Sequence, residues 1–345
     1  MSIMKGLILH LGLFVTAVIL AVFVWNKEDS PIRDERLQVS VWAGSPAGIK
    51  AVRYESDTVN VELAARKDDQ GAWYIGKVER FSKANANPHA GVPNAPKMED
   101  KGKDPKSDKP VSTKTFIAVK SAEELLGKLA PLQAYRAVGK IDKQREAEFG
   151  FENPQGKLHV DLDGRKHTLI IGSTTPGGAD RYAKVAASGE VYAIPGDIVD
   201  MLVSADARLV ERDLHGFEMK EADRVVIQKG DKRREIVRVP EKEDGWADAA
   251  TPSKLDETAG NWMTKVDRLR ISEYVDKPAK PIQQEDVVAR IEYFDGQKRL
   301  GYLELVNPGK DAGHFLVRTE QSRWYAEVPK SMGEQVEQDL PSVLK

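Results

Sequence analysis

The chain has 345 residues, enough for two domains of ordinary size or three small ones. Hydrophobic residues make up 41% and charged residues 31%, so most of the chain is expected to fold and stay soluble. The 52 Lys and Arg nearly balance the 54 Asp and Glu, which argues against a nucleic-acid-binding protein with its basic excess. The chain contains no cysteine, which excludes disulfide scaffolds, thiolate metal sites and cysteine nucleophiles.

The first expected element is a membrane anchor over residues 6–25. This run is apolar apart from His10, and at about 1.5 Å per residue it would span roughly 30 Å, the thickness of the hydrocarbon core. A cleaved signal peptide is the alternative, but it would have a shorter apolar region and a cleavage site of small residues. Lys5 precedes the run, and after it Lys27 is outnumbered by Glu28 and Asp29, so the positive-inside rule predicts a cytoplasmic tail of residues 1–5.

Residues 82–110 are predicted to form a flexible insertion. They include five prolines and six lysines but no Leu, Ile or aromatic residue. Such a segment cannot bury enough apolar area to offset the entropy lost on ordering. A tolerated surface loop is the simpler interpretation, and a partner-binding arm is the alternative.

An internal duplication is the strongest pattern in the rest of the chain. Four landmarks recur 132 to 134 residues apart: Asp163-Gly164 and Asp295-Gly296, Tyr182 and Phe315, Tyr192 and Tyr325, and Pro195 and Pro329. Asp-Gly favours the positive φ of a tight hairpin turn, and each proline stands where the first turn of a helix tolerates it. Each copy is therefore expected to contain alternating strands joined by a hairpin, followed by a short helix.

Similar strands and a tryptophan precede each copy, Trp73 in the first and Trp246 in the second. The soluble part is therefore predicted to be two copies of one module, over 38–212 and 217–343, with the insertion in the first. The predicted fold class is α+β, with an N-terminal transmembrane helix followed by duplicated modules of mainly antiparallel sheet with short helices.

The motifs of enzymes are largely missing from the sequence. The nearest approach to a phosphate-binding loop runs from Gly150 to Leu158, but it is one residue too long and has leucine where Ser or Thr binds Mg²⁺. His159 and His167 flank a predicted hairpin, yet two imidazoles make at best half a zinc site. Asp161 and Asp163 are more simply solvated residues beside a turn than an acid–base pair. We expect no catalytic, cofactor-binding or metal-binding residue, and a chain that is not an enzyme.

One aromatic residue is a candidate partner contact. Tyr192 and Tyr325 are predicted to be equivalent core residues, so the neighbouring Trp324 would point to the other face of its strand. With Arg323 and Arg318 nearby, an exposed tryptophan would fit a protein contact or a platform for a sugar. The simpler alternative is a tryptophan that covers the second face of the sheet against a helix.

The chain also resembles a known family. Phe149-Gly150-Phe151-Glu152-Asn153-Pro154, followed by Leu169-Ile170-Ile171-Gly172, Tyr182-Ala183-Lys184 and Val191-Tyr192, is similar to the signature of a bacterial domain family of unknown function. The resemblance covers about 40–275, and it departs at Phe151, where leucine is usual, and at the insertion. Members are typically membrane-anchored and periplasmic, and they are often encoded beside ABC transporters of the gliding-motility type. The family carries no established catalytic residues.

The resemblance implies a single-pass protein of the bacterial inner membrane, with a cytoplasmic N-terminus and a periplasmic bulk. It also implies three partners: an ABC transporter permease, a membrane-anchored auxiliary subunit and a separate ATPase chain. The functional hypothesis is a non-catalytic, membrane-anchored extracytoplasmic subunit of an ABC-type transport complex that acts by docking, without cofactor or nucleic acid. The alternative is a stand-alone envelope module that binds glycan or lipid, and a hydrolase is a weaker third hypothesis.

Overall fold

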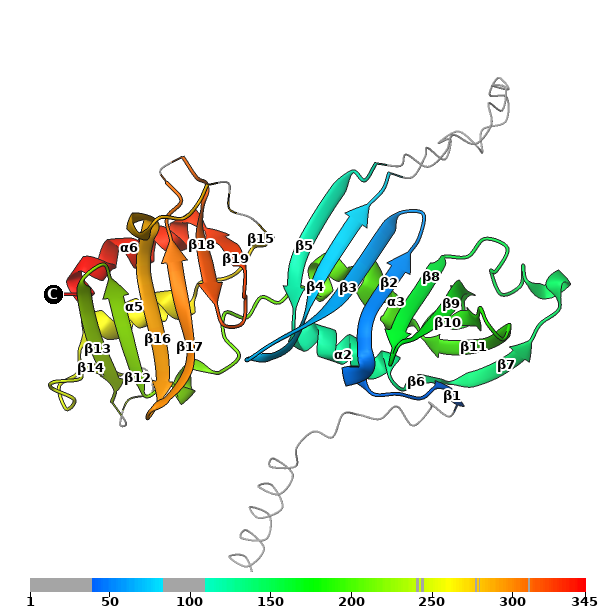
Figure 1. Ribbon diagram of the computed structural model, residues 1–345, viewed down its shortest axis with the longest axis horizontal. Helices are drawn as coiled ribbons and strands as arrows, with labels where there is room; N and C mark the ends of the chain where they lie inside the picture. The colour runs from blue at the N-terminus through cyan, green and yellow to red at the C-terminus, as the bar shows by residue number, and fades with distance from the viewer. Residues whose placement is uncertain are drawn as a thin grey trace, which may run out of the picture.

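The computed structural model describes residues 39–82 and 109–345, except 240, 241, 243, 244, 277, 279 and 310 (Figure 1). The predicted tail 1–5, the predicted anchor 6–25 and most of the predicted insertion 82–110 lie outside these residues. Within the described ranges, no helix is both long and apolar enough to cross a membrane. The longest has 14 residues, about 21 Å, against roughly 30 Å of hydrocarbon. This finding corrects two predictions: the transmembrane helix of the fold class and the single-pass localisation in the inner membrane.

The described chain is built mainly from three sheets in which all paired strands run antiparallel. The first large sheet contains β2 (Ile49–Glu55), β3 (Val59–Asp68), β4 (Gly71–Arg80), β5 (Ser112–Ala118), β7 (Arg136–Lys140), β8 (Gly156–Leu162), β9 (Arg165–Thr174), β10 (Asp180–Val185) and β11 (Glu190–Pro195). The second contains β12 (Arg224–Lys229), β13 (Lys232–Arg238), β14 (Trp246–Asp248), β15 (Glu273–Val275), β16 (Val287–Asp295), β17 (Lys298–Val306), β18 (His314–Thr319) and β19 (Tyr325–Pro329). The small sheet pairs β1 (Val39–Trp42) with β6 (Leu132–Ala134).

Five α-helices and four short 3₁₀ helices complete this part of the chain. The α-helices are α2 (Lys120–Leu129), α3 (Gly196–Val203), α4 (Ala205–Arg208), α5 (Glu257–Asp267) and α6 (Lys330–Val343). The 3₁₀ helices are η1 (Pro46–Gly48), η2 (Lys143–Arg145), η3 (Met219–Glu221) and η4 (Gln284–Asp286).

The two large sheets have corresponding strand orders. The first is β5-β4-β3-β2-β8-β9-β10-β11-β7, and the second is β14-β13-β12-β16-β17-β18-β19-β15. When β5 is set aside, the strands correspond one to one. The Asp-Gly dipeptides lie in the corresponding hairpins β8–β9 and β16–β17, with φ of 75° at Gly164 and 56° at Gly296. The module boundaries 38–212 and 217–343 stay predictions, and each range contains one of the two large sheets.

Helices cover one face of each large sheet (Figure 1). α2 and α3 lie behind the first sheet and α5 and α6 behind the second. Tryptophans anchor both layers, since Nε1 of Trp42 donates to the carbonyl of Leu129 (2.8 Å) and Nε1 of the fully buried Trp262 donates to that of Val336 (2.9 Å). The main core therefore lies between the sheets and their helices.

The opposite face of the first sheet carries a second, smaller core. Phe149 and Phe151 fold over β10 and β11 and pack with Tyr182 and Val191. The ring of Phe149 meets that of Tyr182 edge-on at 4.8 Å. Gly172 belongs to the same arrangement, because a side chain there would collide with the carbonyl oxygen of Phe149. The residues that carry the family resemblance thus form a packing motif.

Candidate functional site

Arg318 lies on the face of the second sheet opposite its helices. Phe315 packs against Gly333 of α6, and strand alternation then turns Arg318 to the other side. Glu304 lies beside Arg318 on the paired strand β17 and is only 8% exposed. Its carboxylate accepts hydrogen bonds from the hydroxyl of Tyr325 (2.6 Å) and from Nη2 of Arg318 (3.3 Å), and Nη1 of Arg290 is 3.5 Å away. Because an unpaired buried charge is costly, these donors and the carboxylate hold one another in place.

On this face, arginine guanidinium groups lie close to tyrosine rings. The guanidinium of Arg318 lies 4.9 Å from the ring centre of Tyr325. Those of Arg290 and Arg299 lie 5.4 and 5.5 Å from the ring centre of Tyr302. These distances fit cation–π contacts. We call Arg290, Arg299, Tyr302, Arg318 and Tyr325 the Arg–Tyr face. Arg290, Arg299 and Tyr302 were not predicted from the sequence. Alternation places Arg290 and Tyr302 on the same face as Glu304, and the register shift between Gly301 and Arg299 adds Arg299 to it.

The expected equivalence of Tyr192 and Tyr325 is wrong by one residue. Tyr192 pairs with Ala183 and packs against the main core, whereas Ala326 takes the corresponding place opposite Val317. Tyr325 therefore points to the opposite face of its sheet. A shift of one residue along a strand exchanges the two faces, so a small error in alignment moved Tyr325 into the predicted core.

Burial of the phenol is the main cause, and the hydrogen bond to Glu304 the second, of a rise in the pKa of Tyr325 from 10.0 to about 12. The neutral phenol is therefore favoured in the folded state, and its contribution to stability is complete below about pH 10 and lost as the pH rises toward 12. We expect the melting-temperature difference between the unmodified protein and Tyr325→Phe to shrink over this range. The comparison subtracts the other tyrosines, and a constant difference across this range would contradict the assignment.

Arg323 and Trp324 do not form the exposed contact expected from the sequence. Nε of Arg323 donates to Asp68 (2.8 Å), at the end of β3, and the guanidinium lies 5.4 Å from the ring centre of Trp73. The Arg323 side chain is 10% exposed. Trp324 is half-buried and packs against the main core. Of the three predicted contact residues, only Arg318 lies on an open sheet face, and Arg323 instead joins the two large sheets.

The histidines and aspartates of the β8–β9 hairpin do not converge. His159 pairs with Thr168, whose hydroxyl lies 3.0 Å from its Nδ1, whereas His167 stacks on Trp42 at 4.7 Å. Because His167 pairs with Val160, the neighbour of His159, the two imidazoles point to opposite faces. Asp163 occupies the turn with φ of 51°. Across the part of the chain that the structure describes, no group of three or more His, Asp and Glu residues could hold a metal ion.

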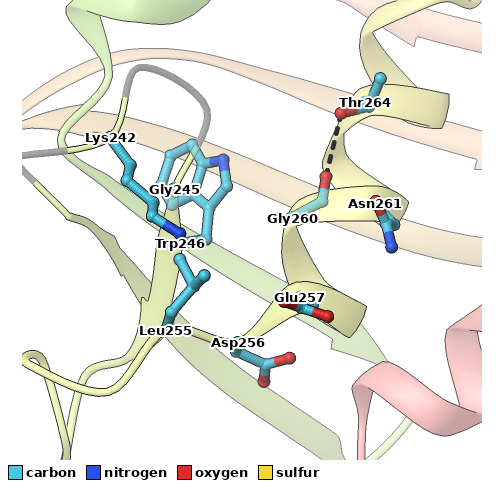
Figure 2. Close-up of a pocket in the computed structure, with 9 residues that line it drawn as sticks. All are labelled: Lys242, Gly245, Trp246, Leu255, Asp256, Glu257, Gly260, Asn261 and Thr264. Atoms are coloured by element: carbon cyan, nitrogen blue, oxygen red, sulfur yellow. Dashed lines mark hydrogen bonds between the residues drawn. The ribbon is translucent and has the colours of Figure 1, made fainter.

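A groove of about 450 Å³ lies between α5 and the segment leading into β14 (Figure 2). Trp246 and Leu255 form its apolar part. Two polar residues on its wall are engaged within the protein: Asp256 caps α5 through the N–H of Ala259 and pairs with Arg234, and the Thr264 hydroxyl donates to the carbonyl of Gly260. These contacts belong to the structure of α5 itself.

A family model described as Domain of unknown function (DUF4340) matches residues 117–286, from the end of β5 to η4. This segment is similar to that family and overlaps the resemblance expected over 40–275. No curated protein and no solved structure matches the chain.

Proposed function

We propose that this chain is a non-catalytic docking protein whose Arg–Tyr face binds another protein. The observation that carries the proposal is the pairing of arginine with tyrosine on a sheet face opposite the helices. Arginine and tyrosine are enriched among the residues that contribute most to protein–protein affinity. Planar guanidinium groups bind carboxylate and carbonyl oxygens, and the rings bind apolar side chains.

The geometry of the face supports binding in a second way. Glu304 fixes Arg318 and Tyr325 before any partner arrives, so less side-chain entropy is lost on association. The partner chemistry that fits is a protein surface with acidic groups beside apolar side chains. We propose an ABC transporter permease or its auxiliary subunit as that partner, with a separate ATPase chain, because the family resemblance implies this setting.

Removing two arginines tests the proposal. Arg290 and Arg299 both lie near Glu292 and have side chains 43% and 46% exposed, so R290A/R299A is expected to fold. We expect this variant to bind the purified permease or auxiliary subunit at least about tenfold more weakly, with a smaller dependence on salt. Titration calorimetry at two salt concentrations measures both effects.

The matched control removes two cations from the first sheet. Arg53 and Lys77 pair with Glu55 and Glu79 at 2.6 Å and have side chains 59% and 48% exposed. R53A/K77A should bind like the unmodified protein. Equal losses in both variants would reject a specific Arg–Tyr face, and tight binding of glycan or lipid without any protein partner would favour the alternative envelope module.

A further inference from the structure

The loop between β18 and β19 contains an unusual run of buried polar residues. Thr319, Glu320, Gln321 and Ser322 are 0%, 9%, 7% and 0% exposed. They are four of the seven buried polar or charged residues within the described ranges. Buried polar groups are costly unless they are hydrogen-bonded, so a run of four requires a dedicated set of partners.

Two of the four residues shape the loop itself. The N–H of Thr319 donates to Oγ of Ser322, and the N–H of Ser322 donates to Oγ1 of Thr319, both at 2.9 Å. This reciprocal pair closes the turn. It also leaves the Glu320 and Gln321 side chains to make contacts outside the loop.

Glu320 and Gln321 bind the segment that connects the two large sheets. The Glu320 carboxylate accepts from the N–H of Gly216 (3.3 Å) and of Tyr302 (2.9 Å), and it lies 2.9 Å from Nδ1 of His215. Nε2 of Gln321 donates to the buried carboxylate of Glu211 (3.2 Å). The loop therefore holds both ends of the segment 211–216.

This connecting segment is in turn bound to the first module. The N–H of Glu211 donates to the carbonyl of Ile117 on β5 (2.8 Å), and the Glu211 carboxylate accepts from the N–H of Lys120 (3.3 Å). The hydroxyl of Tyr274, on β15, donates to the carbonyl of Glu211 (2.9 Å). Glu211 thus joins α2 and β5 of the first module to β15 of the second.

Arg323 adds a direct contact with the first module. Its backbone is left-handed, with φ of 56°, a conformation that costs a residue with a side chain about 1 kcal/mol or more. In this conformation Nε and Nη2 reach the two carboxylate oxygens of Asp68, at 2.8 and 3.4 Å. The strained backbone is therefore compensated by contacts across the junction.

The corresponding loop of the first module has no run of buried polar side chains. Residues 186–189, between β10 and β11, are Ala-Ala-Ser-Gly, and the first three are exposed. The hairpin is closed by the N–H of Gly189 donating to the carbonyl of Val185 (2.8 Å). A hairpin at this place in the fold therefore needs no buried polar residue. The buried polar residues 319–322 are explained by their contacts at the junction between the two modules, not by the hairpin.

We infer that residues 319–323 form a clasp that fixes the two modules in one relative orientation, so that they move as one body. Apolar surfaces alone can slide against each other, whereas a buried network of donors and acceptors is satisfied in only one arrangement. The clasp goes beyond the docking proposal and does not depend on it, because it concerns the chain without a partner.

Because the sequence contains no cysteine, the relative orientation of the two modules can be tested directly with introduced cysteines. Cysteines introduced at the exposed residues Glu62, on β3, and Lys229, on β12, would be the only two in the chain and can carry spin labels, one in each module. Double electron–electron resonance then reports the distribution of distances between the modules. We expect one narrow distribution in the otherwise unmodified protein and a broad or shifted one in Q321A/R323A.

Two further variants keep the test decisive. Asp68→Asn weakens the contact from the first module's side without altering the loop, so it should also broaden the distribution even if Q321A/R323A fails to fold. Ser188→Ala, in the corresponding loop, should leave it narrow. A broad distribution in the unmodified protein, or narrow and unshifted distributions in Asp68→Asn and in folded Q321A/R323A, would overturn the clasp.

Discussion

Replacing Trp262 with alanine is expected to lower the free energy of unfolding by about 3–5 kcal/mol. Trp262 is fully buried between the second sheet and its helices, and its indole joins α5 to α6 through the carbonyl of Val336. The substitution leaves a large cavity and removes the hydrogen bond from the indole to that carbonyl. Denaturant unfolding followed by circular dichroism measures the loss.

Trp262→Phe is the matched control for that substitution. It keeps most of the buried volume and removes the donor, so the loss should be smaller, about 1–2 kcal/mol. A loss below about 1 kcal/mol for the alanine variant would mean that the indole is not packed between the two helices.

Glu304→Ala is expected to lower the free energy of unfolding by about 2–3 kcal/mol. The carboxylate is the shared acceptor for Tyr325 and Arg318 and lies beside Arg290, so its removal leaves partly buried donors without a partner. Chemical denaturation measures the effect. The same variant should weaken binding to the protein partner, because the Arg–Tyr face loses the group that orders it.

Glu292→Ala provides the comparison on the same face. Its side chain is 33% exposed and pairs with Arg299 at 3.0 Å, so its removal should cost less than about 1 kcal/mol. Equal losses for Glu292→Ala and Glu304→Ala would show that burial does not distinguish the two carboxylates.

The hairpins were predictable from the sequence because their signal is local. Asp163-Gly164 and Asp295-Gly296 both form turns between paired strands, as the positive φ preferred by Asp-Gly requires. The face of the sheet to which the Tyr325 side chain points was not predictable in the same way. Between the Asp295-Gly296 turn and Tyr325, β17 carries one extra residue, Leu300, where the pairing passes from Tyr293–Gly301 to Phe294–Arg299. Such a bulge leaves no mark in the pattern of hydrophobicity. The spacing between copies therefore drifts, and the inferred face reverses.

The role of Arg323 was hidden for a different reason. Asp68 and Arg323 are far apart in sequence, and no periodicity relates two charged residues that meet only after both sheets have formed. The cluster around Glu304 was predictable in part. Alternation along β16, β17 and β18 places its members on one face, but the sequence did not reveal that this face lies opposite the helices.

Site-specific photo-cross-linking at Tyr302 tests the docking function most directly. A benzophenone amino acid at this position would lie at the centre of the Arg–Tyr face, and the same amino acid at the exposed Asn261 of α5 would report the opposite side of the second module. We predict that Tyr302 yields one cross-linked product containing an ABC transporter permease or auxiliary subunit, and that R290A/R299A removes it. Cross-links to that partner from Asn261 but not from Tyr302, or a Tyr302 product that R290A/R299A leaves unchanged, would contradict the proposed docking surface.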